Sequence, residues 1–153
     1  LDNELIPVLS PDFRFTGKGA ITLQRFLQQP LILRETGSGS RLAFEQHCVQ
    51  SRLSYESHME FGSNDAVKHA VIAGLGVAVV PKLSVLAELE LGQLKTLPLK
   101  GFPLRRSWCL VHPRGKNLTP VAQAFLDYIQ QNLAVINRHF NPNPASLSRL
   151  AAH

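Results

Sequence analysis

Long apolar segments and cysteines are both scarce in this sequence. The longest uncharged apolar run, residues 70–80, contains two glycines and is far too short to span a bilayer, which takes about 20 apolar residues in a row. The two cysteines, Cys48 and Cys109, lie far apart, and no apolar signal segment opens the chain, so we expect no disulfide framework. Together these absences favour a cytoplasmic protein that does not bind membranes.

Clustered positive charge is also missing, although the net charge is +5 at pH 7. The basic residues are scattered along the chain, and they are locally dense only at Arg105 and Arg106 and at Arg114 and Lys116. Proteins that follow nucleic-acid phosphates concentrate lysine and arginine on one face. We therefore expect a mildly basic, solvated surface, which favours a small anionic ligand over a nucleic acid.

Motifs for nucleophilic catalysis are missing as well. The Gly-Ser-Gly-Ser run at residues 37–40 is not the G-x-S-x-G elbow that exposes a catalytic serine, and no histidine or aspartate is placed by sequence to activate it. Asp65 and His69 lie one helical turn apart, which we interpret as an exposed surface pair rather than a catalytic dyad. We expect no catalytic residues and no enzyme activity.

Metal-ligand spacing is not found among the histidines and cysteines. The adjacent His47 and Cys48 would point in different directions on a helix. Four further histidines show no ligand spacing, namely His58, His112, His139 and His153. We expect no metal and no cofactor, and we interpret Cys48 as a packed thiol and Trp108 as a core residue.

Strand-like and helix-like segments alternate along the 153 residues, which is typical of α/β architecture with parallel strands joined by crossover helices. The pattern predicts strands at residues 5–9, 31–34, 55–61, 77–80, 94–99 and 107–111. It predicts helices capped by Thr22, Ser63 and Thr119, a helix after the 35–41 loop, and a helix at 84–91. The apolar face of the helix after the loop is expected to carry Leu42, Phe44, Cys48 and Val49. The strand at 77–80 is apolar on both faces, so we expect it in the middle of the sheet.

Two strand-to-helix turns contain the residues with the most informative chemistry. These residues are Ser38, Gly39, Ser40 and Arg41 in the first turn and Ser63 and Asn64 in the second. Glycine exposes backbone N–H groups, and a helix start presents unpaired donors at the positive end of its dipole. The hydroxyl, amide and guanidinium groups would add hydrogen bonds and charge. Such turns suit a carboxylate or a phosphate.

Either turn by itself is best interpreted as an ordinary turn and cap, because glycine and serine often precede helices. Both turns are nevertheless expected at the carboxyl ends of strands, and ligands of open α/β sheets bind outside that edge. Their coincidence strengthens the interpretation as an anion site.

Longer motifs carry a resemblance to a known family. LRETGSGSR at residues 33–41, MEFGSNDAVK at 59–68 and AGLGV at 73–77 resemble LysR-type transcription regulators in order and in spacing. GFPLRR at 101–106 and LTPVAQAFL at 118–126 resemble the end of the same effector domain. The likeness covers roughly residues 1–133 and is strongest to the subgroup that controls carbon-fixation operons. Combined in this order, the motifs are far more specific than any one of them.

The resemblance implies an α/β, periplasmic-binding-protein-like (type 2) fold of two lobes, with the first lobe incomplete. Residues 1–29 and 103–137 would form part of the first lobe, residues 30–102 the second lobe, and residues 138–153 a loose tail. Pro103 is a candidate crossover between the lobes. The two turns would form one wall of the cleft between the lobes, and the other wall would come from residues ahead of Leu1. Thr36 stands where the family usually has proline and Ser40 where it usually has threonine, which keeps the hydroxyl.

The function implied by the resemblance is that of an effector-sensing domain. A small anionic metabolite would bind between the lobes and change the geometry of a homodimer or homotetramer. DNA would be bound only through a helix-turn-helix domain that precedes this chain in such regulators. Two alternatives stay open, an extracytoplasmic solute-binding protein of the same fold and an enzyme built on it.

Overall fold

The computed structural model describes residues 2–16, 19–115 and 117–140, with the side chains of residues 139 and 140 excepted. The chain divides into two compact units. One spans Asn3–Arg106, and the other comprises Asp2 and the described residues from Ser107 onward. None of the helices in the described part of the chain has both the length and the apolar character that crossing a membrane requires.

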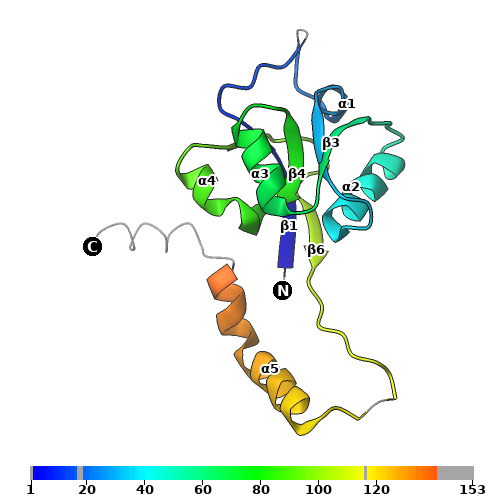
Figure 1. Ribbon diagram of the computed structural model, residues 1–153, viewed down its shortest axis with the longest axis vertical. Helices are drawn as coiled ribbons and strands as arrows, with labels where there is room; N and C mark the ends of the chain where they lie inside the picture. The colour runs from blue at the N-terminus through cyan, green and yellow to red at the C-terminus, as the bar shows by residue number, and fades with distance from the viewer. Residues whose placement is uncertain (1, 17–18, 116, 141–153) are drawn as a thin grey trace, which may run out of the picture. The chain divides into compact units, whose positions relative to one another are not determined.

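The larger unit is built around one mixed sheet (Figure 1). Its strands are β1 (Asp2–Leu9), β2 (Leu31–Arg34), β3 (Ser57–Phe61), β4 (Val77–Pro81), β5 (Lys95–Thr96) and β6 (Leu104–Ser107). The order is β3-β2-β4-β1-β5, and β6 pairs with β1. Strand β2 runs parallel to both β3 and β4, as predicted, whereas β1 is antiparallel to β4 and to β5. The prediction of parallel strands is therefore correct only for the β3-β2-β4 half of the sheet.

Within the described ranges, six helical segments connect the strands or follow them. They are α1 (Leu23–Leu27), α2 (Gly39–Gln50), α3 (Asn64–Ile72), the 3-10 turn η1 (Lys82–Ser84), α4 (Leu86–Glu90) and α5 (Pro120–Phe140). The predicted caps at Thr22 and Ser63 are confirmed, because each side-chain oxygen accepts the backbone N–H three residues later. Thr119 does the same for Ala122 at the start of α5.

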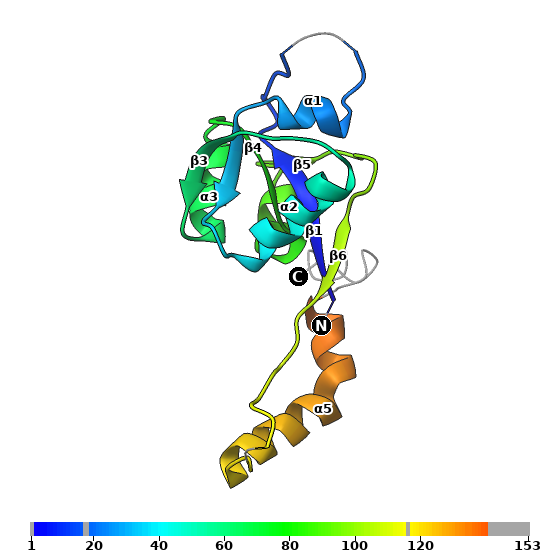
Figure 2. The same ribbon diagram turned by 90° about the vertical axis from the view of Figure 1, so that its right-hand side faces the viewer.

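Two apolar layers enclose the sheet, one on each face. Helix α2 covers one face and α3 covers the other (Figures 1 and 2). Strand β4 lies in the middle of the sheet and is buried throughout, as predicted, with Val77 and Val79 facing the α2 side and Ala78 and Val80 facing the α3 side. This alternation is that of a strand buried between two apolar layers.

Several predicted details differ from the structure. The last strand lies at Leu104–Ser107 instead of residues 107–111, and Trp108, predicted to be in the core, is 48% exposed. On α2 the buried positions are Ala43, Phe44 and Cys48, whereas Leu42 and Val49 are exposed. Apolar residues that flank a helix face satisfy the same periodicity as the face itself, so the sequence pattern does not separate them.

The predicted lobes, residues 1–29 with 103–137 and residues 30–102, and the predicted tail, residues 138–153, stay a prediction. Strand β1 and helix α1 belong to the same compact unit as β2–β5, because β1 is hydrogen bonded to β4. The sequence shows no sign of that pairing, since the partner strand lies about 70 residues along the chain. Helix α5 continues to Phe140, and the rest of the predicted tail, residues 141–153, lies outside the described residues.

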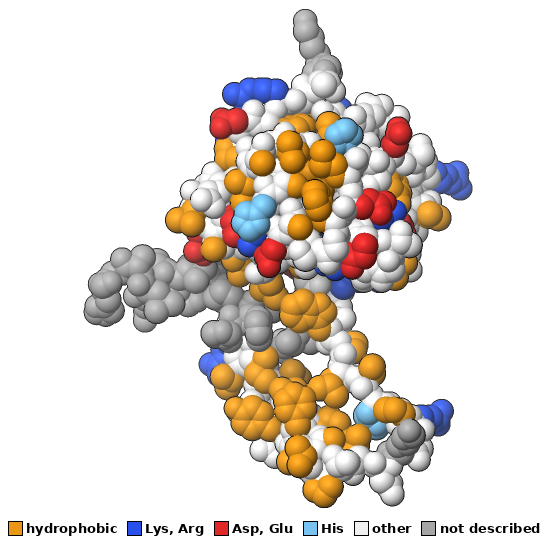
Figure 3. All heavy atoms as spheres, in the orientation of Figure 1, with side chains coloured by type: hydrophobic (Ala, Val, Ile, Leu, Met, Phe, Trp, Pro, Cys, Tyr) orange, Lys and Arg blue, Asp and Glu red, His pale blue; other side chains and the backbone are white. Residues whose placement is uncertain are grey.

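Helix α5 in the smaller unit carries exposed apolar side chains (Figure 3). They include Val121, Phe125 and Leu133, which the sequence places on one helical face at spacing four or eight.

Candidate functional site

The two predicted turns leave the sheet side by side. Arg34 and Phe61 are paired in the parallel register of β2 and β3, and the N–H of Glu35 donates to the Phe61 carbonyl at 3.0 Å. The segments that follow, residues 35–38 and 62–63, therefore start from neighbouring positions at the carboxyl edge. The predicted location of both turns at this edge is confirmed.

The first turn is a capped helix start. Gly37 has a φ of 91°, a left-handed conformation that glycine adopts without strain, and it lets the chain turn into α2. Ser38 Oγ accepts the Arg41 N–H at 3.2 Å, and its hydroxyl hydrogen is left to donate elsewhere. The N–H groups of Gly39 and Ser40 precede the first intrahelical bond, and the Ser40 hydroxyl has no hydrogen-bond partner among the described residues.

The second turn repeats this geometry at the start of α3. Ser63 Oγ accepts the Ala66 N–H at 3.1 Å, and the Ser63 carbonyl accepts the Val67 N–H at 3.2 Å. Asp65 in the first turn pairs with Lys68 Nζ at 3.2 Å, while the His69 ring lies against the Asp65 backbone carbonyl. The His69 ring thus contacts the Asp65 backbone carbonyl instead of its carboxylate.

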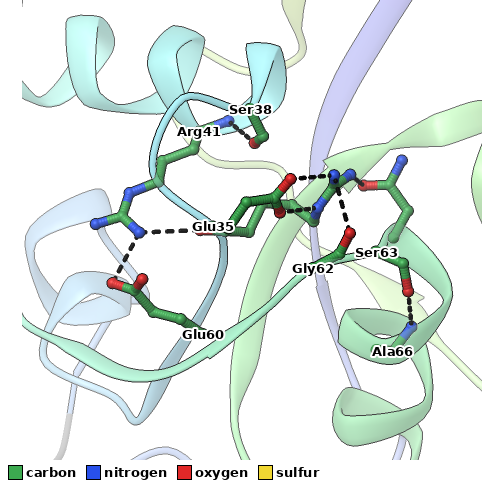
Figure 4. A network of polar contacts seen from close by, with 9 residues as sticks. Glu35, Ser38, Arg41, Glu60, Gly62, Ser63 and Ala66 are labelled. Atoms are coloured by element: carbon green, nitrogen blue, oxygen red, sulfur yellow. Dashed lines mark hydrogen bonds and ion pairs between the residues drawn. The ribbon is translucent and has the colours of Figure 1, made fainter.

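The Arg41 guanidinium makes ion pairs and a hydrogen bond with other residues of the chain (Figure 4). Its Nε lies 2.8 Å from Glu45 Oε1, and its Nη1 lies 2.7 Å from Glu60 Oε1 and donates to the Arg34 carbonyl at 3.0 Å. The side chain is only 11% exposed, and the two carboxylates raise the pKa of the guanidinium. These contacts hold α2 against β2 and β3. The expected role of this guanidinium in binding an anion stays a prediction.

Glu45 is held by two donors. Arg41 and the Tyr55 hydroxyl, whose oxygen lies 2.8 Å from Glu45 Oε1, both lower the pKa of the Glu45 carboxyl, the arginine more strongly. Burial, followed by the hydrogen bond to this carboxylate, raises the pKa of Tyr55. This cluster connects α2, through Arg41 and Glu45, to Tyr55.

Arg34, which the sequence interpretation did not single out, joins the two turns. Its Nε and Nη2 contact the two oxygens of Glu35 at 2.7 and 2.9 Å, and its Nη1 donates to Asn64 Oδ1 at 2.7 Å. Its Nη2 also points to the Gly62 carbonyl at 3.4 Å. The available signal was an arginine that ends a buried apolar strand directly before a glycine-serine loop.

The charges at this edge are compensated internally. Two guanidinium groups, those of Arg34 and Arg41, face the carboxylates of Glu35, Glu45 and Glu60. Net charge therefore does not attract an anion here. What the turns offer is a set of neutral donors, made up of the serine hydroxyls, the Asn64 amide and the first N–H groups of α2 and α3.

Three surface pockets within the larger unit lie away from the two turns. The widest, about 620 Å³, includes Pro30, Ser54 and Ser57 at the amino ends of β2 and β3, which is the opposite edge of the sheet. The other two are about 370 and 450 Å³ and lie beside α2 with β6 and beside the end of α3. Because ligands of such sheets bind at the carboxyl ends of parallel strands, the turns remain the better candidate.

Cys48 is packed in the core, as predicted, with 1% of its surface exposed. Burial raises the pKa of its thiol to about 11, which suppresses the reactive thiolate at neutral pH. Within the described residues no group of three or more histidine, cysteine, aspartate or glutamate side chains is arranged to hold a metal ion.

Comparison with known proteins gives one family match. Residues 1–134 match the family described as the LysR substrate binding domain. The matched range includes both turns and the whole sheet.

Curated relatives are named as transcription regulators. The chain is 43% identical over 128 residues to the RuBisCO operon transcriptional regulator of Acidithiobacillus ferrooxidans, an overlap of 84% of this chain and 41% of the relative. It is 39% identical over 129 residues to the HTH-type transcriptional activator CmpR of Synechocystis, covering 84% of this chain and 42% of the relative. The chain thus spans about two fifths of the length of these relatives.

Solved structures give the same fold. The regulatory domain of CcmR from Synechocystis, in complex with 2-PG, superposes with a TM-score of 0.74 at 32% identity and covers 84% of this chain and 62% of that domain. The effector binding domain of QuiR in complex with shikimate superposes with a TM-score of 0.65 at 20% identity, covering 83% and 59%. These neighbours have the type 2 periplasmic-binding-protein-like fold.

Proposed function

Because the chain belongs to the LysR substrate-binding-domain family, in which it is an effector-binding domain, we propose that it senses a small anionic metabolite through the two adjacent strand-to-helix turns. The observation that carries the proposal is the pairing of Arg34 with Phe61, which brings both helix starts to one edge of the sheet. Ligand-binding groups are assigned to Ser38, Gly39, Ser40, Ser63 and Asn64. The chain provides one wall of the site.

Donors dominate this wall. The Ser38 and Ser63 oxygens already accept backbone N–H groups, so their hydroxyl hydrogens are free to point at a ligand. The Ser40 hydroxyl and the first N–H groups of both helices add further donors. A ligand that matches such a wall presents oxygen acceptors, as a carboxylate or a phosphate does.

Arg41 supports the wall instead of contacting the ligand. Its guanidinium is saturated by Glu45, Glu60 and the Arg34 carbonyl, and its N–H is taken by Ser38. Substitution of Arg41 would therefore weaken effector binding through the position of α2. The complex of the related CcmR domain with 2-PG supports a small-molecule effector.

Transmission of the signal requires more than this chain. Relatives such as CmpR are named as HTH-type regulators and are about twice as long as this chain, which supports DNA binding through a separate helix-turn-helix domain. We propose a cytoplasmic homodimer or homotetramer in which the effector favours one arrangement of subunits over another. The names of the relatives favour this function over an extracytoplasmic solute-binding protein, and we propose no enzyme activity.

A thermal-shift titration tests the effector site. The intact protein is titrated with 2-PG and, separately, with inorganic phosphate, and a ligand at 100 times its Kd adds about 2.7 kcal/mol to stability. We expect a concentration-dependent rise in Tm that is lost in Ser40→Ala. Ser54→Ala is the matched control, because Ser54 is an exposed serine beside the pocket at the opposite edge. An equal rise in wild type and Ser40→Ala, or no rise with either ligand, contradicts the proposed site.

A further inference from the structure

The carboxamide of Asn64 has a defined orientation. Its Oδ1 lies 2.7 Å from Nη1 of Arg34. A guanidinium group carries only donors, so the atom that faces it is the amide oxygen, and the amide NH2 is turned to the other side. Among the residues that the structure describes, no acceptor lies within hydrogen-bond distance of Asn64 Nδ2.

Arg34 is itself fixed on several sides. Its Nε and Nη2 contact both oxygens of Glu35, and Nη2 also points to the Gly62 carbonyl. The guanidinium is planar, so these bonds determine the direction in which Nη1 points. Its side chain is only 18% exposed, which restricts other conformations. The orientation of the Asn64 amide is therefore set by Arg34, from a position 30 residues earlier in the chain.

We propose that Arg34 is a positioning residue that holds the Asn64 carboxamide with its NH2 group toward the effector, so that this position binds an acceptor oxygen and rejects a donor. The inference rests on the proposed function, because it assigns a role within the same ligand-binding wall. A free asparagine side chain presents either its oxygen or its nitrogen to a ligand. Fixed in this way, the Asn64 side chain offers the ligand only its NH2 donor, because its oxygen is bonded to Arg34.

The contacts of Arg34 and Asn64 favour one of two ways of binding an anion, a hydrogen bond from Asn64 over an ion pair with Arg34. Glu35 already occupies the Nε/Nη2 edge of the Arg34 guanidinium and Asn64 its Nη1, so a direct bidentate ion pair between Arg34 and the ligand requires displacement of one of these groups. Asn64 Nδ2 is available without any displacement. The ligand class is thus a carboxylate or phosphate ester recognised by neutral donors, and an amine at the same position is excluded.

The first experiment replaces the donor and keeps the shape. Binding of 2-PG and of inorganic phosphate to the intact protein is measured by calorimetry in wild type, Asn64→Asp and Asn64→Ala. In Asn64→Asp the side chain still accepts from Arg34 but no longer donates, so we expect binding weaker by about 10-fold to 100-fold. Asn64→Ala loses about 10-fold. Gln50→Glu, the same amide-to-carboxylate change at an exposed position on α2, is the charge control and keeps wild-type affinity.

A double-mutant cycle tests the positioning role. Arg34→Lys keeps the positive charge but loses the planar fork, so it no longer holds Glu35 and Asn64 in their present geometry. We expect Arg34→Lys to weaken binding about threefold or more on its own and to have no effect in the Asn64→Ala background. Equal losses in both backgrounds would mean that Arg34 touches the ligand itself, which overturns the positioning role. The midpoint of urea unfolding, measured on every variant, confirms that each is folded.

The outcomes separate this inference from the proposed function. In one outcome, wild type and Asn64→Asp bind a probe equally well and Ser40→Ala does not bind it. This result supports the proposed ligand-binding site and overturns the role of Asn64. If wild type binds neither 2-PG nor phosphate, the anion site and this inference both fail. Loss of binding in Asn64→Asp with full binding in Gln50→Glu supports both.

Discussion

Arg41 Nη1 lies 2.7 Å from Glu60 Oε1, so the first turn of α2 is tied to the edge strand β3 by a single side chain (Figure 4). The same guanidinium contacts Glu45 within α2 and the Arg34 carbonyl at the end of β2. One residue thereby connects three elements at the edge where the ligand is proposed to bind. The helix start that presents the donors is held against the sheet by this contact.

Replacement of Arg41 by methionine tests this connection. Glu45 would lose its strongest partner in a half-buried position, and hydrogen bonds to charged groups contribute about 1.5–3 kcal/mol. Because Glu60 is partly solvated, we expect Arg41→Met to lower the free energy of unfolding by about 1–2 kcal/mol, measured by urea denaturation. Arg14→Met, at an exposed arginine, is the control and should change it by less than about 0.5 kcal/mol. Equal effects of the two substitutions would contradict the structural role of Arg41.

The hydrogen-bonded carboxylates of Glu45 and Glu88 determine how the stability of the fold changes with pH. Arg41 and Tyr55 lower the pKa of Glu45, and Lys68 lowers that of Glu88, below the ordinary value of 4.5. A carboxyl whose pKa is lower in the folded state stabilises the fold above its unfolded pKa, and this contribution is lost as the pH falls through its folded pKa. Stability should therefore decrease as the pH falls from 5 to 3.

Urea unfolding at several pH values measures this decrease. In Glu45→Gln the side chain no longer titrates, so the slope of stability against pH below about 4.5 should become shallower than in wild type. An unchanged slope would show that the Glu45 pKa is the same in the folded and unfolded states.

The two cysteines should react at very different rates. Cys48 is buried and its thiol pKa is raised to about 11, whereas Cys109 is exposed. With a thiol reagent at pH 8 we expect one fast-reacting group per chain, and reaction of the second only after denaturation. Cys109→Ser should abolish the fast phase. A fast phase that persists in this variant would place Cys48 at the surface.

Gly76 should tolerate no side chain. A Cβ at this position would overlap the Pro30 carbonyl oxygen, a backbone atom that also accepts the Val77 N–H at 2.9 Å. We expect Gly76→Ala to lower the free energy of unfolding by about 1–3 kcal/mol through overpacking. Gly62→Ala is the matched control, since a Cβ there meets no atom within 4 Å, and its effect should stay within about 0.5 kcal/mol. Similar stability of the two variants would contradict the close approach of β4 to Pro30.

The helix caps are features that neighbouring residues in the sequence are sufficient to predict. Thr22, Ser63 and Thr119 are each predicted to cap a helix, and each side-chain oxygen accepts the N–H three residues later. Such a bond joins neighbours in the chain, so residue type and the pattern that follows are sufficient to predict it. The parallel pairing of β2 with β3 was predictable for a related reason, because one helix, α2, separates the two strands in sequence.

By itself, then, the sequence determined the family, the order of elements, the helix caps and the edge of the sheet at which the two turns meet. The tertiary structure decided what lies between distant segments. It placed β1 antiparallel to β4, turned the Arg41 guanidinium toward Glu60, and joined Arg34 to Asn64. Hydrophobic periodicity and capping depend on residues within about one helical turn, whereas these contacts depend on how segments tens of residues apart pack around a shared core.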